Sequence, residues 1–84
     1  MTNKESLKKQ IIYRSTHRGS KEMDILLGAF VKTHIEKFDD EELKNLDELL
    51  SIEDETLYKW YFEKNDEMKI PSNSVSDKLK KFKL

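Results

Sequence analysis

The chain contains no cysteine, one proline and two glycines in 84 residues. The lack of cysteine excludes disulfide bonds, thiolate metal sites and a cysteine nucleophile. The longest apolar run is far too short for a membrane-spanning helix. The first residues lack both the apolar core of a signal peptide and the arginine-rich, acid-poor character of a transit segment. We therefore expect the protein to remain in the cytoplasm, where it is made.

A strong net charge is also missing. The 16 basic and 17 acidic residues leave a formal net charge of −1, so no overall field attracts nucleic acid or anionic lipid. Apolar residues make up 36% of the chain and fall at helical spacing, which favours a folded protein over a disordered one. The length predicts a single domain over residues 1–84, in which residues 65–84 form a tail with a short basic helix.

Helical periodicity predicts an all-α bundle of about five helices, and no segment alternates with a strand period over a useful length. Thr2 or Asn3 is a candidate cap for the first helix, Ser20 for the second, and Ser72 or Ser74 for the last. The expected spans are about 4–15, 21–37, 40–50 and 55–64, with a basic fifth helix after the proline. The first helix should bury Leu7, Ile11 and Ile12.

The second predicted helix has the strongest periodic pattern, so we expect it to be the longer of the first two and the centre of the core. Its stripe comprises Met23, Leu26, Leu27, Phe30, Val31, His34, Ile35 and Phe38. Gly28 lies in its middle, where glycine costs about 1 kcal/mol relative to alanine. We therefore expect a neighbouring helix to pack unusually close to Gly28. Asp39 and Glu42 have the spacing of a capping box for the third helix.

The corner between the first two helices, His17 to Asp24, combines a basic pair, a glycine and two acidic residues. Gly19 would free the backbone to turn and would let another surface approach. Arg18 offers a planar fork of donors for carboxylate, phosphate or carbonyl oxygens. Glu22 and Asp24 lie near a helix N-terminus, where negative charge is favoured. The alternative is an ordinary helix–helix turn crossed by an Arg18–Glu22 ion pair.

Signatures of catalysis are lacking, so an enzyme is the least favoured class. With two glycines there is no phosphate-binding glycine loop, and His17 and His34 without cysteine do not make a zinc site. His34 lies beside the apolar face of its helix, which favours a packed, hydrogen-bonded histidine over a metal ligand. We expect no metal site and no catalytic residue.

Four aromatic residues gather in the fourth helix at Tyr58, Trp60, Tyr61 and Phe62. They can pack in the core or its rim, or form an exposed contact for a protein partner. Because four aromatics within five positions cannot all face one core, at least one should lie near the surface. For Trp60 the two interpretations remain balanced, and one of the tyrosines is expected at an interface.

Several of these motifs together resemble the succinate dehydrogenase FAD assembly factors, also called flavinylation factors or succinate dehydrogenase assembly factor 2. The resemblance runs from about Lys8 to about Phe62, and residues after Asn65 show no clear match. It is carried by Arg18-Gly19-x-x-Glu22-x-Asp24, Leu26-Leu27-Gly28-x-Phe30, Leu49-Leu50, Asp54, Leu57-Tyr58 and Trp60.

The resemblance implies a five-helix bundle that binds the flavoprotein subunit of succinate dehydrogenase, or of fumarate reductase, and promotes covalent attachment of FAD. The flavoprotein's own groups would perform the chemistry, so the factor would hold no cofactor stably. It is also expected to be a monomer when free. The implied partner-binding residues are Arg18, Gly19, Glu22, Asp24 and His17. We expect the corner that carries them, including the Arg18 guanidinium, to face outward as a docking surface. His17 stands where many members of the family have another arginine, and Ser20 where an apolar residue is common.

Two other classes remain open on the sequence. One is a helical regulator or antitoxin-like adaptor that binds another protein through the same face. The other is a nucleic-acid-binding module that uses the basic segment from Lys78 to Lys83, which the near-zero net charge disfavours.

Overall fold

The computed structural model describes residues 3–65 and 67–83, which contain helices and no strand. The helices are α1 (Asn3–Thr16), α2 (Lys21–His34), α3 (Asp40–Leu50), α4 (Asp54–Tyr61) and α5 (Ser74–Lys81). The expected all-α bundle of five helices is confirmed. Thr2, one of the two candidate caps for the first helix, lies outside the described residues.

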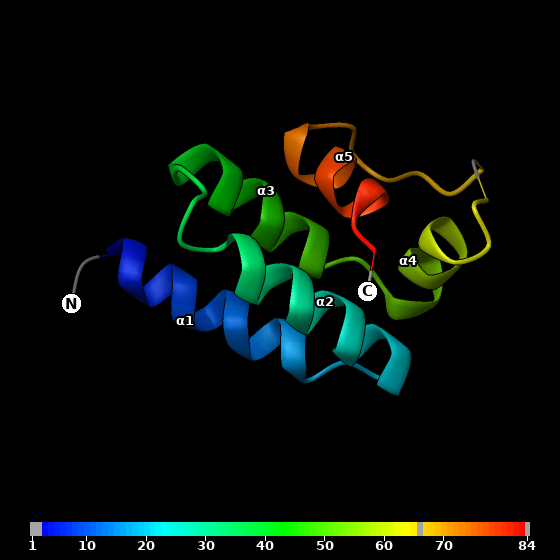
Figure 1. Ribbon diagram of the computed structural model, residues 1–84, viewed down its shortest axis with the longest axis horizontal. Coiled ribbons are helices and arrows are strands. Elements are labelled where there is room, and N and C mark those ends of the chain that lie inside the picture. Colours follow the sequence, from blue (N-terminus) through cyan, green and yellow to red (C-terminus); the bar gives the residue numbers. More distant parts are fainter. Residues whose placement is uncertain (1–2, 66, 84) are drawn as a thin grey trace.

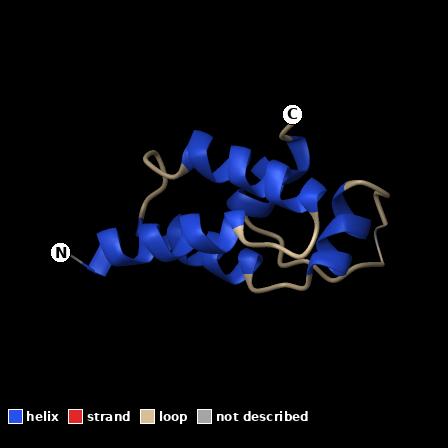
Figure 2. Ribbon diagram, turned by 90° about the horizontal axis from the view of Figure 1, so that it is seen from below, coloured by secondary structure: helices blue, strands red, loops and turns tan. Residues whose placement is uncertain are grey.

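The first three helices run back and forth along the length of the molecule, each antiparallel to the one before it, and α5 packs against α3 (Figure 1). Helix α1 packs against both α2 and α3. Seen from below, α4 and the loop after it lie at the end of the molecule away from the N-terminus (Figure 2). No described helix has both the length and the apolar character needed to cross a membrane.

Helix α2 supplies the largest share of the core, as its pattern predicts. The buried apolar side chains of α2 are Met23, Leu26, Leu27, Phe30 and Val31. The other helices add Ile11, Leu43, Leu46, Leu49, Leu50, Leu57, Trp60, Val75 and Leu79. The prediction for Ile12 is wrong, because its side chain is 47% exposed. It lies about 100° around the helix from Ile11 and cannot share the same buried direction.

Helix α2 ends at His34, three residues earlier than expected, so it is no longer than α1. Beyond it the chain tightens into a turn, in which the Lys37 N–H donates to the His34 carbonyl at 2.9 Å. Ile35 and Phe38 remain buried although they lie past the helix. Their apolar spacing therefore continues through a turn, which explains why periodicity overestimated the helix length.

Among the described residues, side chains cap the N-termini of α2, α3 and α5. The predicted capping box of α3 is confirmed: Asp39 accepts from the Glu42 N–H at 2.8 Å, and Glu42 accepts from the Asp39 N–H at 3.2 Å. Ser20 caps α2, as expected, by accepting from the Met23 N–H. For α5 neither predicted serine is the cap. Asn73 takes this role, since its Oδ1 accepts from two backbone N–H groups of the first turn.

The fourth helix is shorter than the expected span of 55–64, because it ends at Tyr61 and Lys64 has a positive φ of 52°. The segment that follows returns to the core. The Tyr61 hydroxyl donates to the Phe82 carbonyl, and the Phe82 ring meets Phe30 edge-on with centroids 5.4 Å apart. Helix α5 and its C-terminal neighbour Phe82 are thus tied to α2 and α4 as well as to α3.

Candidate functional site

The corner between α1 and α2 faces the connection between α3 and α4. Helix α1 ends at Thr16 and α2 begins at Lys21, so residues 17–20 make the turn. Across from it lie the last residue of α3, Leu50, and the first residue of α4, Asp54. The α1–α2 turn and the α3–α4 connection therefore meet at this site, where Arg18 and Asp54 are 36 residues apart in the sequence.

Arg18 joins these links. Its Nε donates to Asp54 Oδ1 at 2.6 Å, Nη2 donates to the Ile52 carbonyl at 2.8 Å, and Nη1 donates to the Leu50 carbonyl. The side chain is only 9% exposed. The expectation that this guanidinium faces outward is therefore wrong for the free protein, since its donors are directed into the chain's own α3–α4 link.

The charges of Arg18 and Asp54 match the dipoles of the helix ends beside them. The Leu50 carbonyl belongs to the C-terminus of α3, where unpaired carbonyls favour a cation. Asp54 lies in the first turn of α4, where the N-terminal N–H groups favour an anion. The Arg18–Asp54 pair thus stabilises two helix ends as well as the corner, and it replaces the Arg18–Glu22 pair that was the alternative.

Gly19 is held by the same carboxylate. Its N–H donates to Asp54 Oδ2, and a Cβ added to Gly19 would lie 3.1 Å from that oxygen. Its φ is not positive, so the turn does not need glycine for its backbone conformation. The close approach predicted for Gly19 does exist, but the approaching group is Asp54 of the same chain.

Asp24 has a similar internal contact. Its Oδ1 accepts from the backbone N–H of Arg18 at 2.6 Å, and the residue is half-buried. The backbone N–H groups of Arg18 and Gly19 are thus each bound by a different carboxylate. The turn is fixed from two sides.

The outer face of the corner carries the other two predicted residues. Glu22 and His17 are both exposed. The His17 ring stacks on Tyr13, with centroids 3.9 Å apart and planes inclined by 16°. Tyr13 and Ile25, also exposed, add apolar surface on α1 and α2. Of the five predicted site residues, the structure directs Arg18 and Asp24 inward and leaves Glu22 and His17 accessible, with Gly19 at the surface between them.

A groove of about 490 Å³ lies between the Gly19 turn and α4. It is lined by Gly19, Ser20, Asp54, Glu55, Tyr58, Lys59 and Glu63. Tyr58 on α4 and Phe62 directly after it are exposed, with ring centroids 4.8 Å apart, whereas Trp60 is 9% exposed and belongs to the core. The expectation that at least one of these aromatics lies near the surface is confirmed, and the balanced alternatives for Trp60 are decided for the core.

Asp54 is the functional candidate that reasoning from spacing did not include. It appeared only as one of the positions that carry the family resemblance. An acidic residue in the first turn of a helix is usually a solvated contribution to the helix dipole, and nothing local distinguishes Asp54 from Glu55. Only the tertiary structure brings it to Arg18.

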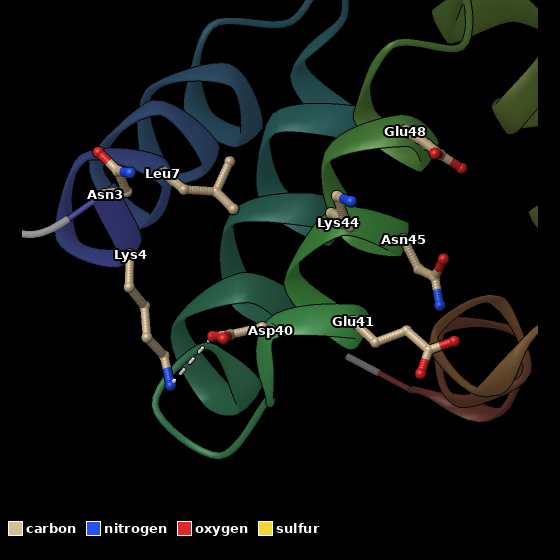
Figure 3. A pocket seen from close by; sticks show the side chains of 8 residues that line it. All are labelled: Asn3, Lys4, Leu7, Asp40, Glu41, Lys44, Asn45 and Glu48. Carbon is tan, nitrogen blue, oxygen red and sulfur yellow. Dashed lines mark ion pairs between the residues drawn. The ribbon is translucent and has the colours of Figure 1, made fainter.

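A second and larger hollow, about 680 Å³, lies between the start of α1 and α3. In Figure 3 the Leu7 side chain points into it, and Lys4 pairs with Asp40 at its edge. Most of its lining is exposed and charged, and none of the predicted site residues borders it. This hollow is therefore a less suitable candidate than the corner.

The packing expected for His34 is confirmed: its ring is half-buried, with its centroid 4.7 Å from that of Phe30 and its plane within 8° of that of Phe38. The hydrogen bond expected for this ring stays a prediction. Burial, followed by the charges of Lys37 and Lys78, lowers the pKa of its imidazole below the usual value of 6.5. Among the described residues no group of three or more His, Asp or Glu side chains is placed to hold a metal ion.

Comparison with known proteins assigns the chain to a family. A family model described as "Flavinator of succinate dehydrogenase" (Sdh5) matches residues 9–83. The chain belongs to the Sdh5 family. The match extends past Phe62 and includes α5. The residues after Asn65, in which the motifs alone showed no clear match, are therefore covered by the family model as well.

Curated relatives of this Sdh5-family chain have consistent names. "Succinate dehydrogenase assembly factor 2, mitochondrial" of Meyerozyma guilliermondii is 34% identical over 68 residues, which cover 81% of this chain and 50% of the relative. The protein of the same name from Dictyostelium discoideum is 32% identical over 76 residues (90% and 52%). "FAD assembly factor SdhE" of Acetobacter pasteurianus is 33% identical over 60 residues (71% and 55%).

The Sdh5-family chain spans about half the length of these relatives. No solved structure matches it significantly. The names favour the assembly-factor interpretation over the antitoxin-like regulator. Mitochondrial names among the relatives give no support to the expected cytoplasmic location.

Proposed function

We propose that this protein binds the flavoprotein subunit of succinate dehydrogenase and promotes covalent attachment of FAD to it. The observation that carries the proposal is the match of residues 9–83 to the succinate dehydrogenase flavinators. The relative from Acetobacter, named as an FAD assembly factor, supports the same role. The family resemblance extends the proposal to the flavoprotein subunit of fumarate reductase as a second partner.

The proposed docking surface is the outer face of the α1–α2 corner, with Glu22, Gly19 and His17 in contact with the flavoprotein. Glu22 is exposed in the first turn of α2, so its carboxylate is available for a charge-assisted hydrogen bond. Arg18 and Asp24 belong to the same site but support it from within. Binding that favours the attachment-competent form of the flavoprotein raises the population of that form.

We place the chemistry on the flavoprotein, so the protein itself is not an enzyme and holds no FAD. An FAD pyrophosphate would be bound by N–H or guanidinium donors, and the corner offers both. There the Arg18 guanidinium and the Gly19 N–H are already bound to Asp54, which supports a role without direct flavin binding. A flavin absorbance spectrum of the purified protein tests this, since bound FAD would contradict it.

Two further parts of the proposal concern the free protein. We propose that it is a monomer and that it acts in the cytoplasm. The location is proposed from the first residues of the sequence, which do not have the pattern of a targeting segment, and the names of the mitochondrial relatives do not support it. Light scattering of the purified protein and fractionation of the host cell test these two statements.

The decisive experiment is deletion of the gene in its host, followed by in-gel flavin fluorescence of the succinate dehydrogenase subunit. Loss of the fluorescent band, with the subunit still present on an immunoblot, is the expected result. Restoring the gene should restore the band. A fully fluorescent subunit in the deletion strain would show that this protein is not required for flavinylation, and the proposal would then be abandoned.

A further inference from the structure

The Asp54 carboxylate has two oxygens that bind different parts of the corner. Oδ1 accepts from the Arg18 side chain at 2.6 Å, and Oδ2 accepts from the Gly19 backbone N–H. A single side chain on α4 therefore fixes both the charged side chain and the backbone of a turn 35 residues away.

We propose that Asp54 is a positioning residue for partner recognition, which holds the Gly19 turn in the shape that the flavoprotein binds. The bonds of Asp54 to Arg18 and to the Gly19 N–H form a clamp on this turn. In this proposal Arg18 belongs to the clamp and does not contact the flavoprotein. The inference rests on the proposed function for the identity of the partner. Its structural half, the clamp, depends only on the contacts within this chain.

Burial supports an internal role for Arg18. A guanidinium that made its principal contacts with a partner would be exposed in the free protein, but the Arg18 side chain is 9% exposed. Its contacts are the Asp54 carboxylate and the carbonyls of Leu50 and Ile52. To reach a partner, it would have to leave a paired carboxylate and two carbonyls that it now satisfies, which is costly.

The position of the turn connects this clamp to recognition. Gly19 and Ser20 form one wall of the groove whose other wall is α4, and Glu22 follows on the same end of α2. Any loosening of the Gly19 turn therefore changes the groove and the direction of the first turn of α2. Asp54 thus determines the shape of the proposed docking surface, although other residues of that surface make the principal contacts with the flavoprotein.

The chain allows a sharp test. In Asp54→Asn one oxygen becomes an NH₂ group, which must face either the Arg18 guanidinium or the Gly19 N–H, a donor against a donor. Arg18→Lys keeps the charge but loses the planar fork that reaches three acceptors. Glu53→Gln, one residue away and exposed, is the matched control because it removes the same charge beside the same helix.

Two quantities are measured for each variant and for the double variant Arg18→Lys/Asp54→Asn. One is the exchange rate of the Gly19 amide hydrogen by NMR, and the other is the affinity for purified apo-flavoprotein subunit. We expect Asp54→Asn to speed Gly19 exchange and to weaken binding, each by about tenfold or more, with helical circular dichroism unchanged at the assay temperature. Glu53→Gln should match the wild type.

The double variant separates the clamp from direct contact. If Arg18 acts through the clamp, the double variant should bind no more weakly than whichever single variant has the larger loss of affinity. Additive losses would show that Arg18 contacts the flavoprotein itself and would overturn the proposal. Wild-type binding combined with unchanged Gly19 exchange in Asp54→Asn would overturn the clamp. Failure of the wild type to bind would instead overturn the proposed function and, with it, the recognition role, whatever the exchange rates show.

Discussion

Gly19 and Asp54 are so close that a methyl group on Gly19 would lie 3.1 Å from Asp54 Oδ2. This distance is shorter than an ordinary contact between a carbon and an oxygen. Glycine is thus favoured at this position by a neighbour that is distant in the sequence and not by the local backbone, whose φ is not positive.

Gly19→Ala should therefore lower the free energy of unfolding by about 1 kcal/mol, because the Asp54 carboxylate must move and weaken its bonds to Arg18 and to the turn. Urea denaturation measures the change. The same variant should bind the flavoprotein more weakly at a temperature where it is fully folded. Stability and affinity equal to those of the wild type would show that the contact is easily relieved.

Gly28→Ala should have the opposite effect on stability. A Cβ at Gly28 would lie 3.6 Å from Thr16 Cγ2, which is ordinary van der Waals contact, so the unusually close packing expected at Gly28 is not present. Alanine in a helix interior is favoured over glycine by up to about 1 kcal/mol. We expect the urea midpoint to rise, and a fall would indicate a clash that the structure does not have.

Glu22→Gln should weaken flavoprotein binding with little loss of stability. The exposed carboxylate lies in the first turn of α2, where its interaction with the helix dipole contributes about 0.3–1 kcal/mol. Glu41→Gln is the matched control, since Glu41 is exposed in the first turn of α3. Both variants should have similar unfolding curves, and only Glu22→Gln should lose affinity. Equal affinities would remove Glu22 from the docking surface.

Trp60→Ala and Phe62→Ala distinguish the core aromatic from a surface one. Trp60 is 9% exposed and Phe62 39%. We expect Trp60→Ala to lower the free energy of unfolding by about 3–5 kcal/mol, which can prevent folding in a domain of this size, and Phe62→Ala to lower it by about 1 kcal/mol. Chemical denaturation ranks the two. A larger loss for Phe62→Ala would contradict the assignment of Trp60 to the core.

The stability of the wild type should fall as the pH is lowered through the region of His34 titration. The lowered pKa means that the unfolded chain binds a proton more readily than the folded one. The contribution of the neutral ring is therefore complete above the usual value of 6.5 and is lost as the pH falls toward the lowered pKa. Glu42, whose charge raises the pKa of His34, partly opposes this shift.

The variant His34→Gln isolates this contribution. Unfolding free energies measured between about pH 5 and pH 8 should decrease less on acidification for this variant than for the wild type. Identical pH dependence in the two proteins would show that His34 titrates alike in the folded and unfolded states.

Local signals were sufficient for much of this fold. The Asp39–Glu42 capping box and the Ser20 cap are interactions between residues three apart, so spacing alone predicts them. The α2 stripe is likewise readable, because its period is that of the helix. The cap of α5 was missed because serine and asparagine are equivalent candidates and three of them stand in a row.

The contacts inside the α1–α2 corner could not be predicted from the sequence in the same way. Arg18, Glu22 and Asp24 are close in the sequence, and this suggested a local ion pair or an outward-facing charge. The true partner of the Arg18 side chain lies on α4, and no periodicity or cap signal relates the two. A contact of this kind depends on how helices pack, which composition and spacing do not determine. The partner-binding role of the corner itself stays a prediction.

The long separation between Arg18 and Asp54 also has a kinetic consequence. The α1–α2 hairpin can form early from neighbouring residues, but its turn acquires its carboxylate only after α3 and α4 have docked. A half-folded molecule therefore has the right residues at the corner without the right shape. In the proposed function, only copies of this protein that have finished folding would then promote FAD attachment to the flavoprotein.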